Sequence, residues 1–367
     1  MTLFDELGIR PVINAAATLT RLGGSRMPPE VLEAMRDAAR SFVDLDEVQT
    51  RVGAELARLT HNEAAYVATG AAAGIALAVA ACVTRQDRAA MNRLPDANGR
   101  EVLAFKSHRN VYEHAVRMVG VRLIEIGDEH HSALAQLEAA FTDQTAAFVW
   151  FQGAMTGRGD WPLPTVIEMC RARRVPVIVD AAAQLPPMEN LWAFTQLGAA
   201  DAIFSGGKDL QGPQSSGLVV GQQWLIDAMR PIGNPNAGFG RPMKVGKEEM
   251  AGLLAAVKRY LTLDHVGRRA RDERVVADWC QAFSALPGLT AQRSFPNEAG
   301  QPLPRCEVML GAGAKLTRDE LITALRAGTP SIEISGATAP STCYLNPMTL
   351  NDAEAQIVTA RLVELLS

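Results

Sequence analysis

A lysine in a glycine-rich turn is the residue of this chain best placed for covalent chemistry. Residues 201–213 read Asp-Ala-Ile-Phe-Ser-Gly-Gly-Lys-Asp-Leu-Gln-Gly-Pro, so an apolar run is followed by Ser-Gly-Gly and then by Lys208. An amine reaches a carbonyl carbon only when its backbone is held and the space in front of it is clear, and glycines provide that space. Lys208 is therefore a candidate for forming a Schiff base. A solvated loop lysine fits these residues equally well when they are taken alone.

A single carboxylate follows another apolar run. Asp180 ends the run Pro-Val-Ile-Val-Asp at 176–180 and is followed by three alanines, of which Ala182 is the middle one. A carboxylate at the end of a buried strand needs a charged or hydrogen-bonding partner, and a protonated ring nitrogen would serve. The alanines leave room for a flat ring. The alternative is an aspartate that caps the next helix.

A turn of small residues opens the first long apolar helix. It contains Gly70, Ala71 and Ala72 and matches neither GxGxxG nor a Walker loop. Backbone N–H groups at a helix N-terminus attract anions, so the turn suits a single phosphate monoester. A tight strand-to-helix turn without a ligand is the alternative.

Two further side chains complete a possible cofactor site. His108 follows the run that ends at Phe105 and could stack its ring on a planar cofactor, although a loop histidine without a role is the commoner case. Ser205, three residues before Lys208, could bind a phosphate. Pyridoxal 5'-phosphate requires a phosphate-binding turn, a stacking ring, a carboxylate for its pyridinium nitrogen and a Schiff-base lysine. The turn at Gly70, Ala71 and Ala72 is called the phosphate cup below.

The elements that must position these residues alternate between strands and helices. Strands are expected at 64–67, 102–105, 122–126, 146–151, 176–180, 201–204 and 217–221, and helices at 71–84, 111–119, 132–141, 164–173 and 191–197. Short apolar strands that are each followed by a helix predict an α/β fold with a mostly parallel, seven-stranded sheet. Only the lysine loop separates the last two strands, so one of them can run antiparallel. Ligands of such sheets bind at the carboxyl ends of the strands.

The pattern changes after residue 221. A nearly unbroken helical pattern covers 247–286, and a smaller α+β domain follows, with strands expected at 307–310 and 331–335 and helices at 318–327 and 352–366. The predicted organisation is an N-terminal segment, 1–45, that packs on the small domain or on a partner subunit. A large domain, 46–246, follows, and then the linking helix with the small domain, 247–367.

Composition excludes several classes of function. The net charge is −4 and there is no block of five or more Lys or Arg residues, so a nucleic-acid partner is not expected. The five cysteines are scattered without a CxxC pair, so neither a disulfide framework nor a metal site is indicated. The longest apolar run, 71–83, is too short for a membrane span, and the first residues lack the layout of a signal peptide. A soluble, cytoplasmic protein is expected.

With these motifs in place, the chain resembles the fold-type I pyridoxal-phosphate enzymes. More narrowly, it resembles the branch of bacterial selenocysteine synthase and the D-glucosaminate-6-phosphate ammonia-lyase group. The resemblance extends over almost the whole length and is carried by residues 8–16, 22–27, 69–74, 180–187, 205–214 and 240–249.

The resemblance implies a role for each matching residue. Lys208 would be the Schiff-base lysine, Asp180 the pyridinium partner and His108 the stacking residue. Arg241 and Lys244 would bind a phosphate of the cofactor or substrate across a dimer interface. A homo-oligomer built from dimers is implied as well.

The chain also departs from this group. It has Ala17 and His61 where the group usually has glycine, and Ser335 where an arginine would hold a substrate carboxylate.

The expected reaction removes ammonia from a 2-amino-3-hydroxy sugar acid by an α,β-elimination in which the 3-hydroxyl leaves as water, and the expected substrate is D-glucosaminate-6-phosphate. Arg241, Lys244 and Arg21 are candidates for holding its anionic groups, and each could instead be a surface cation. The alternatives are an aminotransferase or racemase acting on another amino acid, and a non-catalytic module that keeps the fold.

Overall fold

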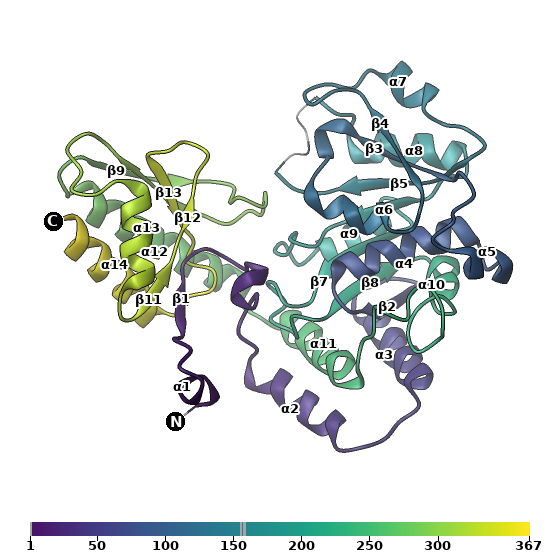
Figure 1. The fold of residues 1–367 in the computed structure, drawn as a ribbon, viewed down its shortest axis with the longest axis horizontal. Coiled ribbons are helices and arrows are strands. Elements are labelled where there is room, and N and C mark those ends of the chain that lie inside the picture. The colour runs from purple at the N-terminus through teal and green to yellow at the C-terminus, as the bar shows by residue number, and fades with distance from the viewer. Residues whose placement is uncertain (1, 155, 157–158) are drawn as a thin grey trace. The chain divides into compact units, whose positions relative to one another are not determined.

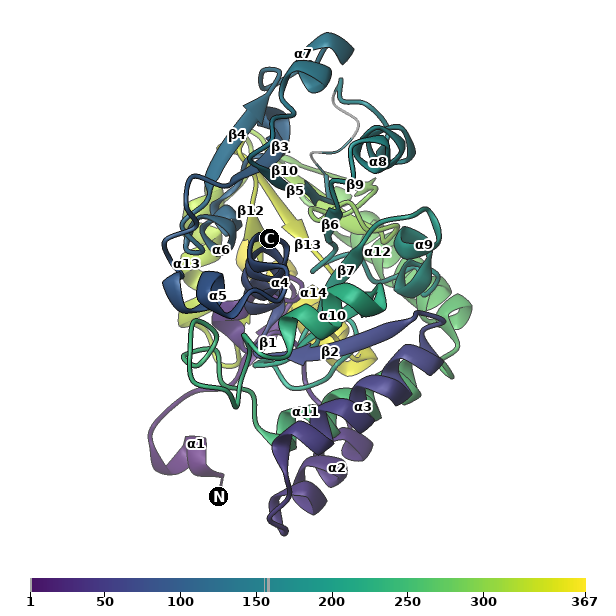
Figure 2. The ribbon, with the colours of Figure 1, turned by 90° about the vertical axis from the view of Figure 1, so that its right-hand side faces the viewer.

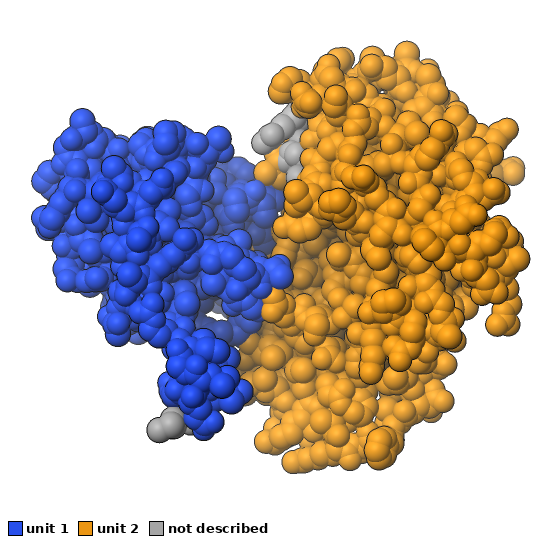
Figure 3. Space-filling model, viewed as in Figure 1, with its two compact units in different colours: residues 1–26, 263–367 blue, residues 27–262 orange. Residues whose placement is uncertain are grey.

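The computed structural model describes residues 2–154, 156 and 159–367 and divides into two compact units. One unit combines residues 1–26 with 263–367, and the other consists of residues 27–262 (Figure 3). Among the described residues, no helix is both long and apolar enough to cross a membrane.

The larger unit, 27–262, is built on a seven-stranded sheet with the order β2-β8-β7-β6-β5-β3-β4 (Figure 1). Its strands are β2 (Ala64–Ala68), β3 (Glu101–Phe105), β4 (Arg122–Ile126), β5 (Thr145–Phe151), β6 (Val177–Asp180), β7 (Asp201–Ser205) and β8 (Gly217–Gly221). Strand β8 runs antiparallel to both of its neighbours, and all other pairs are parallel. The predicted α/β class, the seven strands and an antiparallel strand beside the lysine loop are confirmed.

Ten α-helices and two short 3₁₀ turns are described in this unit. They are α2 (Pro29–Ala39), α3 (Leu45–Leu59), α4 (Ala71–Thr84), α5 (Arg88–Arg93), η2 (Lys106–His108), η3 (Val111–Glu113), α6 (His114–Arg117), α7 (Leu134–Ala139), α8 (Leu163–Ala172), α9 (Asn190–Gln196), α10 (Gln223–Met229) and α11 (Lys247–Tyr260). The alanine-rich α4 packs across the strands from β2 to β5, and α11 lies beside α2 and α3 (Figures 1 and 2). Small side chains let α4 approach closely: a Cβ on Gly74 would meet Ile203 and Val219, each at 2.9 Å.

The smaller unit is an antiparallel sheet with helices and an N-terminal strand. The sheet order is β12-β13-β10-β9, formed by β9 (Leu289–Ser294), β10 (Arg305–Leu310), β12 (Ser335–Gly336) and β13 (Thr342–Leu345). Strand β1 (Val12–Asn14) pairs in parallel with β11 (Ser331–Glu333). The remaining elements are α1 (Leu3–Glu6), η1 (Thr20–Leu22), α12 (His265–Ser284), α13 (Arg318–Ala327) and α14 (Asp352–Leu366).

Three expectations about elements differ from the structure. The continuous helix expected over 247–286 is two helices, because Asp264 caps a new helix by accepting a hydrogen bond from the Gly267 N–H group. The strand expected over 331–335 is divided between β11 and β12, which pair with different partners. The helix expected over 111–119 begins as a 3₁₀ turn and ends at Arg117.

The unit boundaries also differ from the predicted ranges. They fall at 26/27 and 262/263 rather than at 45/46 and 246/247. The physical reason is the packing of α11 on α2 and α3, which joins both α2 and α11 to the larger unit.

Candidate active site

The lysine loop connects β7 to β8 and is closed by its own backbone. The Gly206 N–H group donates to the Ser216 carbonyl at 2.9 Å, and the Gly212 N–H group donates to the Gly206 carbonyl at 2.8 Å. A Cβ on Gly207 would lie 2.5 Å from the Cα of Gln214, so a side chain there would open the loop. The glycines beside Lys208 are therefore required by close backbone packing.

Asp180 lies at the carboxyl end of β6, next to the strand that leads to Lys208. Strands β6 and β7 are parallel neighbours with Asp180 opposite Ile203, so both chain segments leave the same edge of the sheet. Asp180 is 9% exposed, and its Oδ1 accepts a hydrogen bond from the Ala182 N–H group at 3.0 Å.

The two charged groups interact. Burial raises the pKa of Asp180, and the Ala182 N–H group and the Lys208 ammonium oppose that rise. Burial lowers the pKa of Lys208, and the Asp180 carboxylate opposes that change. The predicted pair is thus brought together. A partly buried amine with a lowered pKa is suited to nucleophilic attack and to taking up a proton.

The predicted phosphate cup lies beside the end of the lysine loop. Gly70 is the N-cap of α4 with φ +109°, and no side chain caps the helix. Gly217 pairs with Ser205 across the β7–β8 ladder, and a Cβ added to it would lie 2.5 Å from the Gly70 carbonyl oxygen and 2.8 Å from the Ala71 nitrogen. The backbone contact of Gly217 with Gly70 and Ala71 therefore brings Ser205 close to the start of α4. The uncapped helix end has N–H groups suited to an anion.

The structure buries His108 among contacts that the sequence did not predict. Its imidazole is completely buried, with its ring 4.7 Å from that of Trp150 in an edge-on arrangement. Nε2 lies 3.1 Å from Asp160 Oδ2, and the Ser107 hydroxyl donates to Asp160 Oδ1 at 2.5 Å. Burial lowers the pKa of His108, and Asp160 opposes that change. Its ring is not open to a ligand in this conformation, so stacking on a cofactor stays a prediction.

The remaining candidates are not brought to Lys208 by any described contact. Arg241 and Lys244 are exposed on the segment between α10 and α11. Arg21 belongs to the smaller unit, where it forms an ion pair with Glu333, and Arg326 binds the same carboxylate at 2.6 Å. Ser335 is half-buried in β12.

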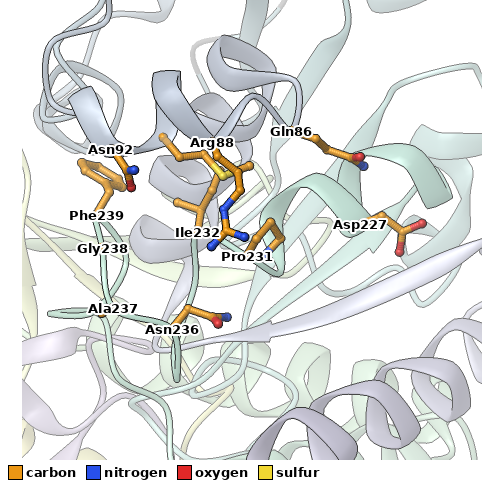
Figure 4. Close-up of a pocket in the computed structure, with 11 residues that line it drawn as sticks. Gln86, Arg88, Asn92, Asp227, Pro231, Ile232, Asn236, Ala237, Gly238 and Phe239 are labelled. Carbon is orange, nitrogen blue, oxygen red and sulfur yellow. The ribbon is translucent and has the colours of Figure 1, made fainter.

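A cavity of about 620 Å³ lies elsewhere in the larger unit (Figure 4). Arg88, Asn92 and Asp227 contribute to its lining together with the turn at 236–239. None of the predicted site residues lines it. It is therefore distinct from the candidate active site.

The candidate residues fit pyridoxal phosphate by their own chemistry. A buried carboxylate, an amine with a lowered pKa and an uncapped helix N-terminus match a ring nitrogen, an aldehyde and a phosphate, respectively. His108 Nδ1 is buried without a hydrogen-bond partner among the described residues.

This fold and site define the class of fold-type I pyridoxal-phosphate enzymes, and comparison with known proteins agrees. Residues 25–235 match the family model of the class-V aminotransferases. The chain belongs to this pyridoxal-phosphate-dependent family.

Two curated relatives match over almost the full length of both this chain and the relative. D-glucosaminate-6-phosphate ammonia lyase of Salmonella typhimurium is 32% identical over 99% of this chain and 97% of the relative. A Streptomyces 5'-C-glycyluridine monooxygenase-decarboxylase is 34% identical over 99% of this chain and 92% of the relative. The solved structure of a D-glucosaminate-6-phosphate ammonia-lyase superposes with a TM-score of 0.86 at 32% identity, covering 100% of this chain and 98% of that one. The predicted resemblance is confirmed.

Proposed function

We propose that this enzyme removes ammonia from D-glucosaminate-6-phosphate, or a closely similar 2-amino-3-hydroxy sugar acid, by α,β-elimination. The product would be 2-keto-3-deoxygluconate-6-phosphate. The observation that carries this proposal is the buried Asp180–Lys208 pair beside an uncapped helix end. The full-length similarity to a lyase with this substrate supports it.

Each residue of the site has a part in the proposed reaction. Pyridoxal phosphate, when bound, supplies an electron-withdrawing ring that makes the Cα–H bond of an attached amino acid acidic. Lys208 would hold the cofactor before the substrate arrives, and its amine would then be free to take up the Cα proton. Asp180 would accept a hydrogen bond from the protonated ring nitrogen and keep that nitrogen charged.

The remaining residues bind and orient. The cofactor phosphate would be held by the N–H groups of Gly70, Ala71 and Ala72 and by the Ser205 hydroxyl, and Ala182 would leave space for the ring. The proton taken up by Lys208 would pass to the 3-hydroxyl, which would leave as water. The unsaturated amine that remains would then react with one water molecule to give the 2-keto acid and ammonia.

The anionic ends of the substrate need cations. Arg241, Lys244 and Arg21 are the candidates, and the exposure of Arg241 and Lys244 is compatible with a role at a partner subunit's site. We infer a homo-oligomer of dimers on this ground. The five cysteines are free thiols in the structure, which supports a reducing, cytoplasmic setting.

A second candidate function rests on the 34% identity to the Streptomyces enzyme. In this reading, the same Asp180–Lys208 pair would serve an oxygen-dependent decarboxylation of a nucleoside amino acid. Transamination and racemisation also require no change in these two residues. The products therefore decide between the reactions.

The test is a substrate panel with the purified holoenzyme. D-glucosaminate-6-phosphate, unphosphorylated D-glucosaminate and 5'-C-glycyluridine are each supplied, while ammonia, 2-keto acid, carbon dioxide and oxygen uptake are measured. The proposal predicts equal amounts of ammonia and 2-keto acid from the sugar acid phosphate, without oxygen uptake, and no turnover by Lys208→Ala. Oxygen uptake with carbon dioxide release from the nucleoside alone would overturn it.

A further inference from the structure

Helix α11 holds the lysine loop through one of its faces. Leu253, Ala256 and Tyr260 recur at helical spacing along that face. A Cβ on Gly206 would lie 2.9 Å from Leu253 Cδ1, and a Cβ on Gly212 would lie 3.2 Å from Ala256 Cβ. The loop backbone around Lys208 therefore rests directly on this helix.

Two polar side chains at the end of α11 bind the loop. The Tyr260 hydroxyl donates to Asp209 Oδ2 at 2.9 Å, and Arg259 Nη1 donates to Gln211 Oε1 at 2.9 Å. Tyr260 is completely buried and Asp209 is 4% exposed. A hydrogen bond between two such buried groups is costly to remove, because the carboxylate cannot replace it with water.

The two loop residues bonded to α11 lie within three residues after Lys208 in the chain. Asp209 directly follows Lys208, and Gln211 has a left-handed backbone with φ +58°. Such a conformation is unfavourable for a residue other than glycine and persists only where its surroundings enforce it. Two hydrogen bonds hold Gln211 in this conformation. One is donated by Arg259 to the Gln211 side chain, and the other is donated by the Gln211 N–H group to the Lys208 carbonyl at 3.0 Å.

We propose that Tyr260 is a positioning residue, which sets the place of the Lys208 amine by holding Asp209 against helix α11. This inference rests on the proposed role of Lys208. A small displacement of the Asp209 backbone moves the adjacent lysine relative to Asp180 and the phosphate cup. A misplacement of about 1 Å can lower the rate about a hundredfold.

The test compares Tyr260→Phe with a matched tyrosine variant. Tyr344 in the smaller unit donates to Glu307 Oε1 at 3.0 Å, so Tyr344→Phe removes a similar tyrosine–carboxylate bond away from the lysine loop. For each holoenzyme, kcat, KM and the pH midpoint of the visible absorbance of the lysine-bound cofactor are measured. The affinity of each apoenzyme for pyridoxal phosphate is measured as well.

Tyr260→Phe is expected to lower kcat roughly tenfold or more with KM nearly unchanged, and to shift the pH midpoint of the absorbance. Tyr344→Phe is expected to leave kcat and this midpoint at wild-type values. Asp209→Asn keeps an acceptor for the hydroxyl and should retain more activity than Asp209→Ala. If Tyr260→Phe has the wild-type midpoint and kcat, the inference is wrong. Borohydride trapping in the wild-type enzyme distinguishes failure of this inference from failure of the proposed function. Absence of the cofactor from Lys208 would refute the proposed function.

Discussion

At the scale of single residues, burial rather than ion pairing dominates the chemistry of the candidate site. Desolvation is the largest influence on both Asp180 and Lys208, and it favours the neutral form of each. A protonated ring nitrogen would restore the charge of Asp180, because an opposite charge within a few ångströms favours the ionised carboxylate. The apoenzyme therefore has a site that a cationic heterocycle completes.

We expect Asp180→Asn to lower kcat about a hundredfold or more, because a neutral amide cannot keep the ring nitrogen protonated. The matched control is Asp201→Asn, which changes another fully buried aspartate at the opposite end of the neighbouring strand β7. Steady-state kinetics of both variants checks this. Equal activities of Asp180→Asn and Asp201→Asn would contradict the role given to Asp180.

Asp201 itself predicts a dependence of stability on pH. Burial raises the pKa of Asp201 well above the usual value, and the backbone N–H group of Val179 opposes that rise. A raised folded-state pKa stabilises the protein below the unfolded pKa of about 3.9, and this contribution is lost as pH rises through the folded value. Urea unfolding of the apoenzyme should therefore show a smaller loss of stability from pH 5 to pH 8 in Asp201→Asn than in the wild type. A larger loss in the variant would refute this assignment.

At the scale of elements, the phosphate cup depends on the contact between the start of β8 and the start of α4. In Gly217→Ala, the new methyl group would collide with the Gly70 carbonyl and displace the helix N-terminus. We expect the dissociation constant for pyridoxal phosphate to rise roughly tenfold or more, as measured by titration of cofactor fluorescence. Gly336→Ala is the control, since its nearest neighbour would be 3.7 Å away. An unchanged affinity in Gly217→Ala would argue against this cup.

The strands of the large sheet were predictable because nearly all are continuous apolar runs buried on both faces, as in β2, β3 and β6. Strand β9 was missed because most of its residues are at least partly exposed, and its Thr-Ala-Gln-Arg-Ser sequence has no apolar run. Its pairing with β10 depends on a partner more than ten residues away, which local pattern does not reveal.

The reactive residues of the site were predictable, but their supports were not. Lys208, Asp180 and the cup each follow a strand, so strand ends alone indicate them. The Asp160 partner of His108 is 52 residues away in sequence, and the Tyr260 partner of Asp209 is 51 residues away. Such pairings arise from tertiary packing, and the spacing of the residues along the sequence does not indicate them.

At the scale of the whole molecule, the proposed function predicts a homo-oligomer. Arg241 and Lys244 are exposed, and large apolar side chains such as Phe42, Val111 and Tyr112 are also exposed. Exposed apolar surface favours association. Light scattering on the active enzyme should give a molar mass that is an even multiple of the 39.4 kDa chain. A fully active monomer would contradict the oligomer we infer.

The most direct test of the central claim is to locate the cofactor on the chain. Holoenzyme is reduced with borohydride, digested and mapped by mass spectrometry, which reports the lysine that carries the pyridoxyl group. The account predicts the modification on Lys208, with Lys106 and Lys244 unmodified. A pyridoxyl group on another lysine, or none on a holoenzyme loaded one-to-one, would contradict it.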